Sequence, residues 1–384
     1  MTIRHLYPAV EPSLNLDFAN SKRLDSRITF TRASTGTYTD ESGIIRTAAD
    51  NEARFDHDGD GNSLGLLIEQ SRTNYVTTSE DLTGWSNATL GDGVNPTVQN
   101  VSATVPNNGS TVTEITLERG TASTSNYSIY RNQFGTTAVS TGSMYFKAAR
   151  PQDVGKVIDF YHNQGAPQDF ASVTLTNAWQ RVSSVGVGGA AGYLSIALFN
   201  STASTGEVKV LAWGAQVEEG SFPTSYIPTS GSTVTRSADV ASMTGTNFSS
   251  WYNNNEGSLF FTQKTSTYPT NSTYYYLINS GSTVNGYRFA VNVLPVDISG
   301  VSPWPSASWL ALYPGSTFQN MAFAYTDGSA ATAKNGAILE TNTEALADVS
   351  PTLLRIAYNV TSTISRITYY PTRLSNATLQ ALTL

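Results

Sequence analysis

Residues 211–239 read LAWGAQVEEGSFPTSYIPTSGSTVTRSAD, and this stretch decides how the rest of the chain is interpreted. It begins inside a predicted strand, because residues 208–213 have the mixed apolar pattern that suits a strand covered on both faces. Two glycines interrupt that strand, and Pro223 and Pro228 then exclude a regular ladder, because each lacks an N–H and fixes φ. We therefore expect the last strand of one β-domain, followed by a hinge and, beyond Asp239, by a second β-rich unit.

The composition predicts an all-β protein of several domains. A length of 384 residues exceeds one ordinary core and suggests two or three. Charged residues make up only 13%, and the 20 tyrosines, 15 phenylalanines and 6 tryptophans favour strands. The net charge of -7 and the sequence pI near 5.0 give no electrostatic footprint for nucleic acid.

The chain has no cysteine, which excludes a disulfide framework, thiol catalysis and cysteine metal sites. No stretch approaches the ~20 apolar residues of a membrane span, so we expect no membrane insertion. The opening residues, MTIRHLYPAV, lack the apolar core of a signal peptide.

Strand and turn patterns divide the chain into three predicted domains. Residues 1–80 hold a few short strands with little core, so we expect this module to lean on a partner or on the next domain. Residues 81–236 hold eight or nine strands separated by Gly, Asn and Ser turns, the spacing of a sandwich or jelly roll. Residues 237–384 predict a second β-sandwich, in which Asp327-Gly328 and Asn335-Gly336 are expected hairpin turns. This domain closes with a short helix, for which Ser375 is a plausible N-cap.

Residues 13–79 resemble a known N-terminal module. The matching segments are LDF at 16–18, RITFTRASTGTY at 27–38, RFDHD at 54–58 and LGLLIEQSRTN at 64–74. This pattern is similar to bacteriophage virion proteins described as head-spike-fibre or tail-fibre proteins. The resemblance implies that the module attaches the protein to the virus particle or helps it assemble.

Two later segments carry further resemblances. Residues 213–239 are similar to the end of a carbohydrate-binding-type jelly roll in such fibre proteins. The last predicted domain resembles a laminin-G or concanavalin-like sandwich, which implies a lectin-type fold. The motifs that carry this resemblance are YTDG at 325–328, NG at 335–336 and the closing YYPTRLS at 369–375. For residues 213–239, a structural role as strand plus linker stands beside a direct ligand role.

Aromatic residues near strand ends and turns are candidates for sugar binding, because aromatic faces stack on the apolar faces of sugar rings. They are Tyr127, Tyr130, Tyr161 and His162 in the predicted jelly roll, and Trp304 and Trp309 in the loop VSPWPSASW. The alternative is structural: each tyrosine caps a sandwich edge, and the tryptophans form a plug between sheets.

Asp56, Asp58 and Asp60, followed by Gly61, occupy the first, third, fifth and sixth places of a calcium-loop pattern. The place that needs a bidentate acid holds Leu67, so the match is partial. A weak Ca²⁺ site and a solvated turn are both open, and no other cofactor is expected.

The sequence predicts no enzyme. His5, His57 and His162 are the only histidines, and none lies in a nucleophile motif. A glycosidase needs two facing carboxylates, whereas Glu218 and Glu219 are adjacent and point to opposite faces of a strand. Acids from distant positions are not excluded from converging in space.

These observations and the resemblance together predict a virion surface protein, made in the host cytoplasm and released by lysis. Its expected partners are other virion proteins of the capsid or tail and a host-surface glycan, and its expected state is a homotrimer. A purely structural capsid decoration protein and a glycan-degrading tail component remain as alternatives.

Overall fold

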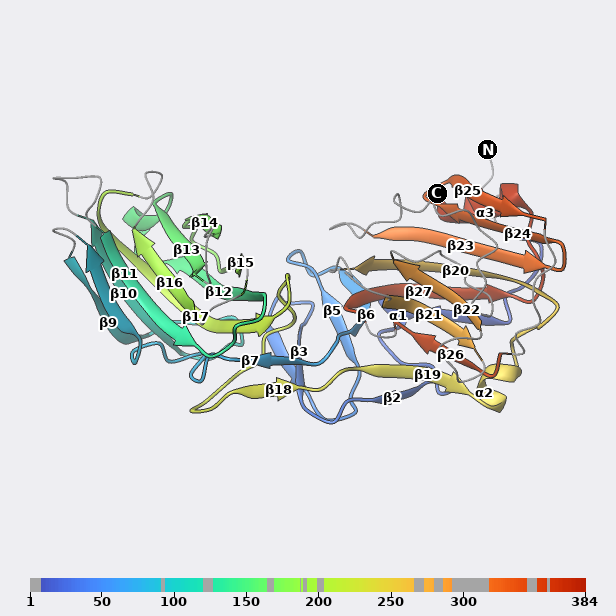
Figure 1. The fold of residues 1–384 in the computed structure, drawn as a ribbon, viewed down its shortest axis with the longest axis horizontal. Coiled ribbons are helices and arrows are strands. Elements are labelled where there is room, and N and C mark those ends of the chain that lie inside the picture. The colour runs from blue at the N-terminus through green and yellow to red at the C-terminus, as the bar shows by residue number, and fades with distance from the viewer. Residues whose placement is uncertain are drawn as a thin grey trace. The chain divides into compact units, whose positions relative to one another are not determined.

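The computed structural model describes residues 8–90, 94–119, 127–163, 169–186, 188, 192–198, 204–265, 273–279, 286–291, 318–343, 351–357 and 360–384. Contacts divide the chain into two compact units (Figure 1). The first unit comprises Met1–Gly43, Thr47–Gln70 and Ser237–Leu384, and the second comprises Ile44–Arg46 and Ser71–Arg236. The second unit is therefore inserted into the sequence of the first.

The first unit contains two antiparallel sheets. Its eight-stranded sheet has the order β25 (Ala337–Asn342), β24 (Ser329–Lys334), β23 (Gln319–Thr326), β20 (Glu256–Thr265), β27 (Ser362–Tyr370), β6 (Ser63–Ile68) and β5 (Arg54–His57), and β1 (Leu14–Asp17) also pairs with β27. Its five-stranded sheet has the order β2 (Thr29–Thr31), β19 (Val240–Thr244), β26 (Leu353–Ile356), β21 (Thr273–Asn279) and β22 (Gly286–Val291). The all-β fold class predicted from the sequence is confirmed.

Both ends of the chain contribute to the main core of the first unit. Leu16 and Phe18 lie in one buried cluster with Met243, Phe261 and Ile367. From the sequence we expect residues 1–80 and 237–384 in separate domains, whereas the structure gives residues up to Gln70 and from Ser237 onward one core. The physical reason is that strands of three to six residues cannot bury both of their faces alone. Here β1 pairs antiparallel with β27, so that Leu16 stands opposite Ile367.

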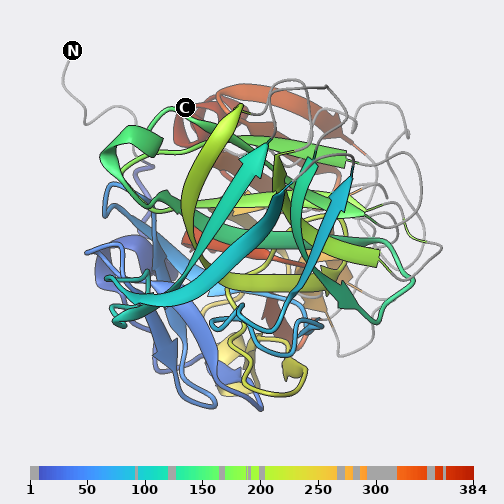
Figure 2. The same ribbon diagram turned by 90° about the vertical axis from the view of Figure 1, so that its left-hand side faces the viewer.

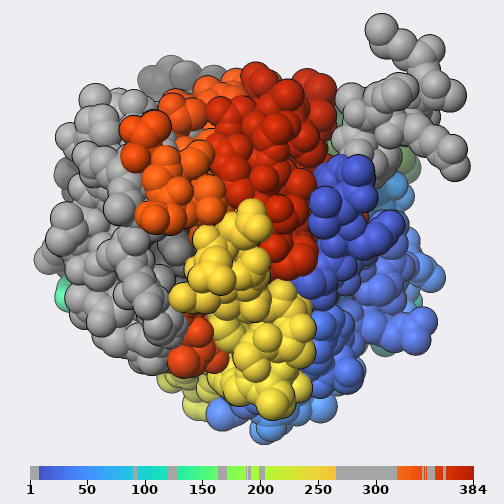
Figure 3. All heavy atoms as spheres, turned by 90° about the vertical axis from the view of Figure 1, so that its right-hand side faces the viewer, coloured from blue at the N-terminus to red at the C-terminus, as the bar shows by residue number. Residues whose placement is uncertain are grey.

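Short helices complete the first unit. They are α1 (Phe18–Ser21), α2 (Thr246–Ser249) and α3 (Asn376–Thr383). Figure 3 shows the N-terminal segment, the residues around α2 in yellow and C-terminal residues in red side by side on this unit. There Trp251 accepts a hydrogen bond from Ser13 Oγ at 2.7 Å and packs edge-on against Tyr369, with ring centroids 5.0 Å apart.

The predicted C-terminal helix and two hairpin turns are confirmed. Ser375 Oγ accepts a hydrogen bond from the Thr378 N–H at 3.1 Å, which caps α3. Leu379 of α3 is fully buried against Phe260, which lies on the face of β20 opposite the main core. Asp327-Gly328 joins β23 to β24, and Asn335-Gly336 joins β24 to β25.

The second unit is a sandwich of two five-stranded antiparallel sheets (Figures 1 and 2). The β17 sheet has the order β15 (Gln180–Gly186), β12 (Ser140–Ala148), β17 (Gly206–Glu219), β10 (Thr111–Arg119) and β9 (Val94–Ser102). The β16 sheet has the order β14 (Asp169–Thr174), β13 (Val157–Asn163), β16 (Gly192–Leu198), β11 (Tyr127–Phe134) and β8 (Ser86–Leu90). The chain passes repeatedly between the sheets, as in a jelly roll.

The sandwich core lies between the two sheets. Leu194 and Ile196 of β16 and Phe160 of β13 are fully buried in it together with Phe146 of β12. The rings of Phe146 and Phe160 meet across the sheets with centroids 5.2 Å apart. Because side chains alternate along a strand, the residues between these positions lie on the outer face of each sheet.

The remaining short elements are β3 (Gly36–Thr39), β4 (Ile45–Ala48), the 3₁₀ turn η2 (Pro151–Asp153), and the paired strands β7 (Arg72–Asn74) and β18 (Val234–Arg236). Within β17, Gly214 has a φ of 69° where the pairing with β12 shifts register. The sequence predicts a strand over Glu207–Gln216 that Gly214 interrupts, whereas the observed strand passes through a bulge at Gly214 and continues to Glu219.

Candidate functional site

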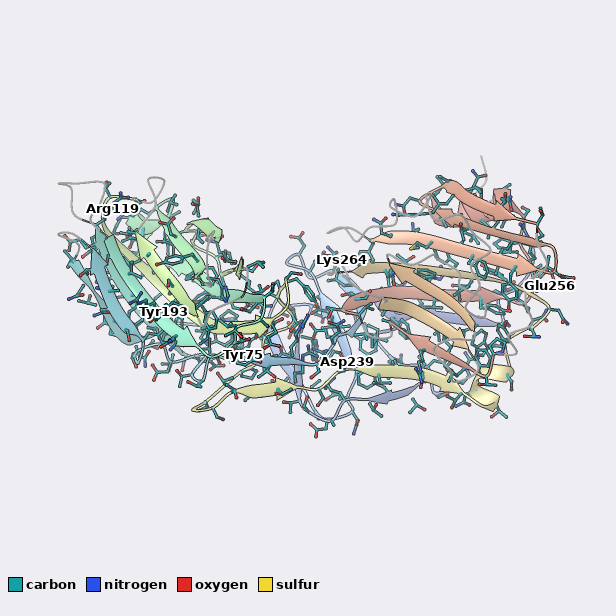
Figure 4. All side chains as sticks on the ribbon, viewed as in Figure 1. Tyr75, Arg119, Tyr193, Asp239, Glu256 and Lys264 are labelled. Carbon is teal, nitrogen blue, oxygen red and sulfur yellow. The ribbon has the colours of Figure 1, made fainter. Side chains whose placement is uncertain are left out.

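A buried charge cluster collects the motif residues of the first unit. Its members are Arg32 of RITFTRAS, Arg54 of RFDHD, Glu69 of LGLLIE and Asp239 at the end of the stretch 211–239, and all four side chains are at most 2% exposed. Arg32 Nη1 lies 3.0 Å from Asp239 Oδ1, and Arg54 Nη1 lies 2.7 Å from Glu69 Oε2. Arg54 also donates to Asp239, which Figure 4 labels.

Backbone groups complete this cluster. The Glu69 N–H donates to Asp239 Oδ2 at 2.8 Å, and the Asp239 N–H donates to the Glu69 carbonyl at 2.9 Å. Burial works to lower the pKa of Arg54, but the carboxylates of Glu69 and Asp239 overcome it and raise that pKa. These charges neutralise one another inside the fold, so the motif residues hold segments of the first unit together and present no charge to a ligand.

The motif residues of the second unit form a second buried network. Asn74 donates to the carbonyls of Ala215 and Ile227 at 3.1 and 2.9 Å. Glu218 accepts from the Thr224 N–H at 2.7 Å and from the Thr224 hydroxyl at 3.0 Å. These bonds fasten the segment after β17 along that strand.

The expectation of a hinge after residue 220 is therefore wrong for part of this segment. Thr224, Tyr226, Ile227 and Thr229 are all at most 6% exposed. The Tyr226 ring lies against Trp213, with centroids 4.7 Å apart. Proline does exclude a regular ladder here, but side-chain hydrogen bonds replace the ladder and keep the segment packed within the second unit.

In the loop with the calcium-type pattern, backbone N–H groups donate to the Asp56 and Asp58 carboxylates. Asp58 Oδ1 accepts from the N–H groups of Asp60 and Asn62 at 3.0 and 2.8 Å. Asp56 instead accepts from the Thr39 N–H at 2.7 Å, and burial raises the pKa of the Asp56 carboxyl. Within the described residues no group of three or more His, Cys, Asp or Glu could hold a metal ion. Among them, too, no helix is long and apolar enough to span a membrane.

Two of the aromatic candidates lie inside the sandwich. Tyr130 is 2% exposed, and its ring stacks on Trp85 with centroids 5.9 Å apart. His162 is fully buried, stacks on Phe134 and lies with Nε2 3.1 Å from Ser140 Oγ. Burial lowers the pKa of His162 to about 4. The expectation that these rings face a sugar is corrected, because their strand positions point them into the core.

The other candidates have different outcomes. Tyr161 lies on the outer face of the β16 sheet but is only 5% exposed, in a cluster with Ile129 and Ala197. Tyr127 opens β11, but its side chain is outside the described residues. Trp304 and Trp309 also lie outside the described residues.

The outer face of the β16 sheet nevertheless carries a small polar and aromatic group. Cα pairing places Ser195 of β16 between Arg131 of β11 and Tyr161 of β13. Two residues away along β16, and so on the same face, Tyr193 stands opposite Gln133. The Arg131 guanidinium lies over the Tyr193 ring, 4.1 Å from its centroid. Figure 4 labels Tyr193 in this unit.

Among the accessible residues of this face are Arg131, Gln133 and Tyr193, which we call the Arg131 platform. Arg131 and Tyr193 are half-buried and Gln133 is exposed, whereas Ser195 and Tyr161 behind them are buried. A ring held by a stacked guanidinium and flanked by an amide offers both an apolar surface and hydrogen-bond donors and acceptors. This combination suits a flat molecule that carries hydroxyl groups.

Of the residues on this face, Tyr161 is a sugar-binding candidate from the sequence, whereas Arg131, Gln133 and Tyr193 are not among those candidates. The alternation of β16 around Leu194 and Ile196 does assign Tyr193 to the outer face. The cross-strand pairing of Tyr193 with Gln133 has no local signal, since the two residues come from strands 60 positions apart.

Comparisons with known proteins give structural matches alone. No family model and no curated protein matches the chain. A family 11 carbohydrate-binding module from Clostridium thermocellum, solved with a mixed-linked tetrasaccharide, matches with 9% identity and a TM-score of 0.28, over 39% of this chain and 96% of the module. Domain 4 of AbnA, a GH43 extracellular arabinanase from Geobacillus stearothermophilus, matches with 14% identity and a TM-score of 0.31, over 43% of this chain and 83% of the domain.

A longer match is the Trypanosoma rangeli sialidase in complex with the inhibitor DANA. Its identity is 9% and its TM-score 0.29, over 89% of this chain and 75% of the sialidase. TM-scores of this size do not establish a shared fold, so the architecture described above relies on strand order and pairing. By those criteria the protein is a two-unit, all-β chain whose inserted unit is a jelly-roll-type sandwich.

Proposed function

We propose that this chain is a non-enzymatic glycan-binding protein on the surface of a bacterial virus, as a head or tail fibre or spike. The observation that carries the binding function is the Arg131 platform, where Tyr193, its stacked guanidinium and Gln133 lie together on one outer face of the sandwich. Aromatic rings bind the apolar faces of sugars, and amide and guanidinium groups bind their hydroxyls.

The virion assignment is supported by the resemblance of residues 13–79 and 213–239 to phage fibre proteins. Several of the motif residues that carry this resemblance form buried networks that stabilise the units. Their role in the proposal is to maintain the scaffold, while the glycan contacts lie on the β16 sheet. Other virion proteins and a homotrimeric state belong to the proposal on the same grounds.

The non-enzymatic part of the proposal is supported by the carboxylates near the platform. Glycosidases act with two facing carboxyl groups, one as acid and one as base or nucleophile. Among the described side chains on the outer face of the β16 sheet, Asp159 is the carboxylate present, and it is fully buried. This arrangement suits binding better than hydrolysis.

A glycan array probed with the full chain tests the binding function. We expect binding to a bacterial surface polysaccharide, and we expect Tyr193→Ala to weaken it at least tenfold, because stacking area is lost. Tyr38→Ala is the matched control, since Tyr38 is a half-buried tyrosine of the first unit. Equal loss in both variants, or no binding by the unmodified chain, would overturn the proposal.

Electron microscopy of intact particles with labelled antibody to residues 81–384 tests the location. Label at the tail supports a receptor-binding fibre. Label on the shell, together with an array that shows no glycan binding, would replace the proposal with a capsid decoration protein. Particles without label would contradict both virion roles.

A further inference from the structure

The Arg131 guanidinium has no carboxylate partner among the described residues, unlike the guanidinium groups of Arg32, Arg54 and Arg150. Arg32 and Arg54 pair with Asp239, and Arg150 pairs with Asp153 at 2.7 Å. Within the described residues no carboxylate lies within 4.0 Å of the Arg131 nitrogens, and Arg131 Nε is buried without a hydrogen-bond acceptor. The guanidinium instead lies over the Tyr193 ring.

A buried N–H without an acceptor, such as that of Arg131 Nε, is costly, because it loses water and gains no hydrogen bond in exchange. Guanidinium groups bind carboxylates through two parallel N–H···O bonds, which are strong and geometrically specific. The contact with the Tyr193 ring holds the Arg131 guanidinium in place before any ligand arrives, so less freedom is lost on binding. The geometry is thus prepared for a planar anion at the edge of the Tyr193 ring.

We propose that the Arg131 platform recognises a carboxylated sugar, with the sugar carboxylate on the Arg131 guanidinium and the ring of the sugar or of its neighbour on Tyr193. This inference rests on the proposed glycan-binding function and names its ligand class. The chain carries a net charge of -7, so long-range repulsion opposes an acidic polymer. Recognition therefore comes from the local contact, and at about 0.15 M salt the repulsion is screened beyond about 8 Å.

The test is an array of bacterial capsular polysaccharides, each printed in its native form and with its carboxylates reduced to alcohols. At 0.15 M salt, the full chain binds at least one native acidic polymer, and reduction weakens that binding about tenfold to a hundredfold. In Arg131→Gln the difference between the native and reduced forms disappears. Arg131→Lys keeps the charge but loses the planar fork, so it gives an intermediate loss.

Arg23→Ala is the control for loss of one positive charge, because Arg23 is exposed in the first unit. Near-ultraviolet circular dichroism of each variant establishes that the aromatic packing is intact. Equal binding of native and reduced polymers overturns the carboxylate assignment and leaves the glycan-binding function standing. Sensitivity to removal of sulfate or phosphate, without sensitivity to carboxyl reduction, also overturns it. Absence of binding to every polymer rejects the glycan-binding function itself.

Discussion

Asp239 is the central acceptor of the buried charge cluster in the first unit. Its two oxygens accept from Arg32, from Arg54 and from the Glu69 N–H. Removing one member of a buried ion-pair network leaves the others charged and without water. Removing one member of this cluster is therefore expected to lower the free energy of unfolding strongly.

Asp239→Ala is expected to destabilise the first unit by about 3–5 kcal/mol, because two buried guanidinium groups lose their carboxylate. Chemical denaturation followed by fluorescence measures the change. Glu41→Ala removes the exposed ion pair with Lys22 and should leave the unfolding midpoint unchanged. A loss of similar size in both variants would show that the cluster contributes no more than a surface pair.

His162 makes the stability of the second unit depend on pH. Burial lowers its pKa from 6.5 to about 4, so the folded state resists protonation more than the unfolded state does. The free energy of unfolding of the second unit is therefore highest above pH 6.5. It falls by about 3 kcal/mol as the pH drops toward 4. Chemical denaturation of the wild type and of His162→Gln at pH 7, 6, 5 and 4.5 measures how the free energy of unfolding of each protein depends on pH. Parallel curves for the two proteins would contradict the assignment.

At the scale of elements, β6 and β27 approach too closely for a side chain at Gly65. Gly65 has a φ of 103°, and an added Cβ would lie 2.1 Å from the Ile364 carbonyl oxygen. Gly65→Ala should therefore separate β6 from β27 and expose the adjoining amides. Hydrogen exchange of residues 362–364 measures the separation. Gly59→Ala, where an added Cβ meets nothing within 4 Å, should leave exchange unchanged; unchanged exchange in Gly65→Ala as well would contradict the prediction.

Helix α3 covers the outer face of the eight-stranded sheet through one buried leucine. Leu379→Ala should destabilise the first unit by about 2–5 kcal/mol, since the cavity adds to the lost burial. Ser375→Ala removes only the N-cap and should destabilise it by about 1 kcal/mol. Thermal unfolding ranks the two variants. The reverse order would mean that the cap, and not the packing, holds the helix in place.

At the scale of the whole molecule, the insertion of one unit into the other predicts two separable folding units. In the first unit, the Asp239 N–H donates to the Glu69 carbonyl and the Glu69 N–H donates to the Asp239 carboxylate, so the points of insertion are adjacent. In the second unit, Arg72 and Arg236 are paired, so its ends are adjacent too. Each of the two large sheets of the first unit, and each five-stranded sheet of the second, takes all of its strands from one unit.

We expect a chain with residues 71–236 replaced by a short glycine–serine linker to fold, and residues 71–236 to fold alone. Calorimetry of the full chain should resolve two transitions that match those of the separate pieces. A deletion that ends inside the sandwich, such as 71–134, is the control and should abolish the second transition. A single transition in the full chain, together with unfolded pieces, would contradict the prediction.

Much of the secondary structure was determined by the sequence alone. Alternation and glycine boundaries predicted eight or nine strands in residues 81–236, where the two sheets of the sandwich have five strands each. The turns at Asp327-Gly328 and Asn335-Gly336 close hairpins as predicted. The cap at Ser375 marked the start of α3. These features depend on residues a few positions apart, so a local pattern is enough to specify them.

Only the tertiary structure decided which segments share a core and which side chains face outward. Arg54 and Asp239 meet across 185 positions, and β1 completes a sheet with the C-terminal strand β27. Tyr161 and His162 are neighbours in the sequence yet point to opposite faces of β13, and only the pairing of the sheets shows that His162 faces the core. The physical reason is that burial and charge pairing depend on register between distant strands, which no local pattern carries.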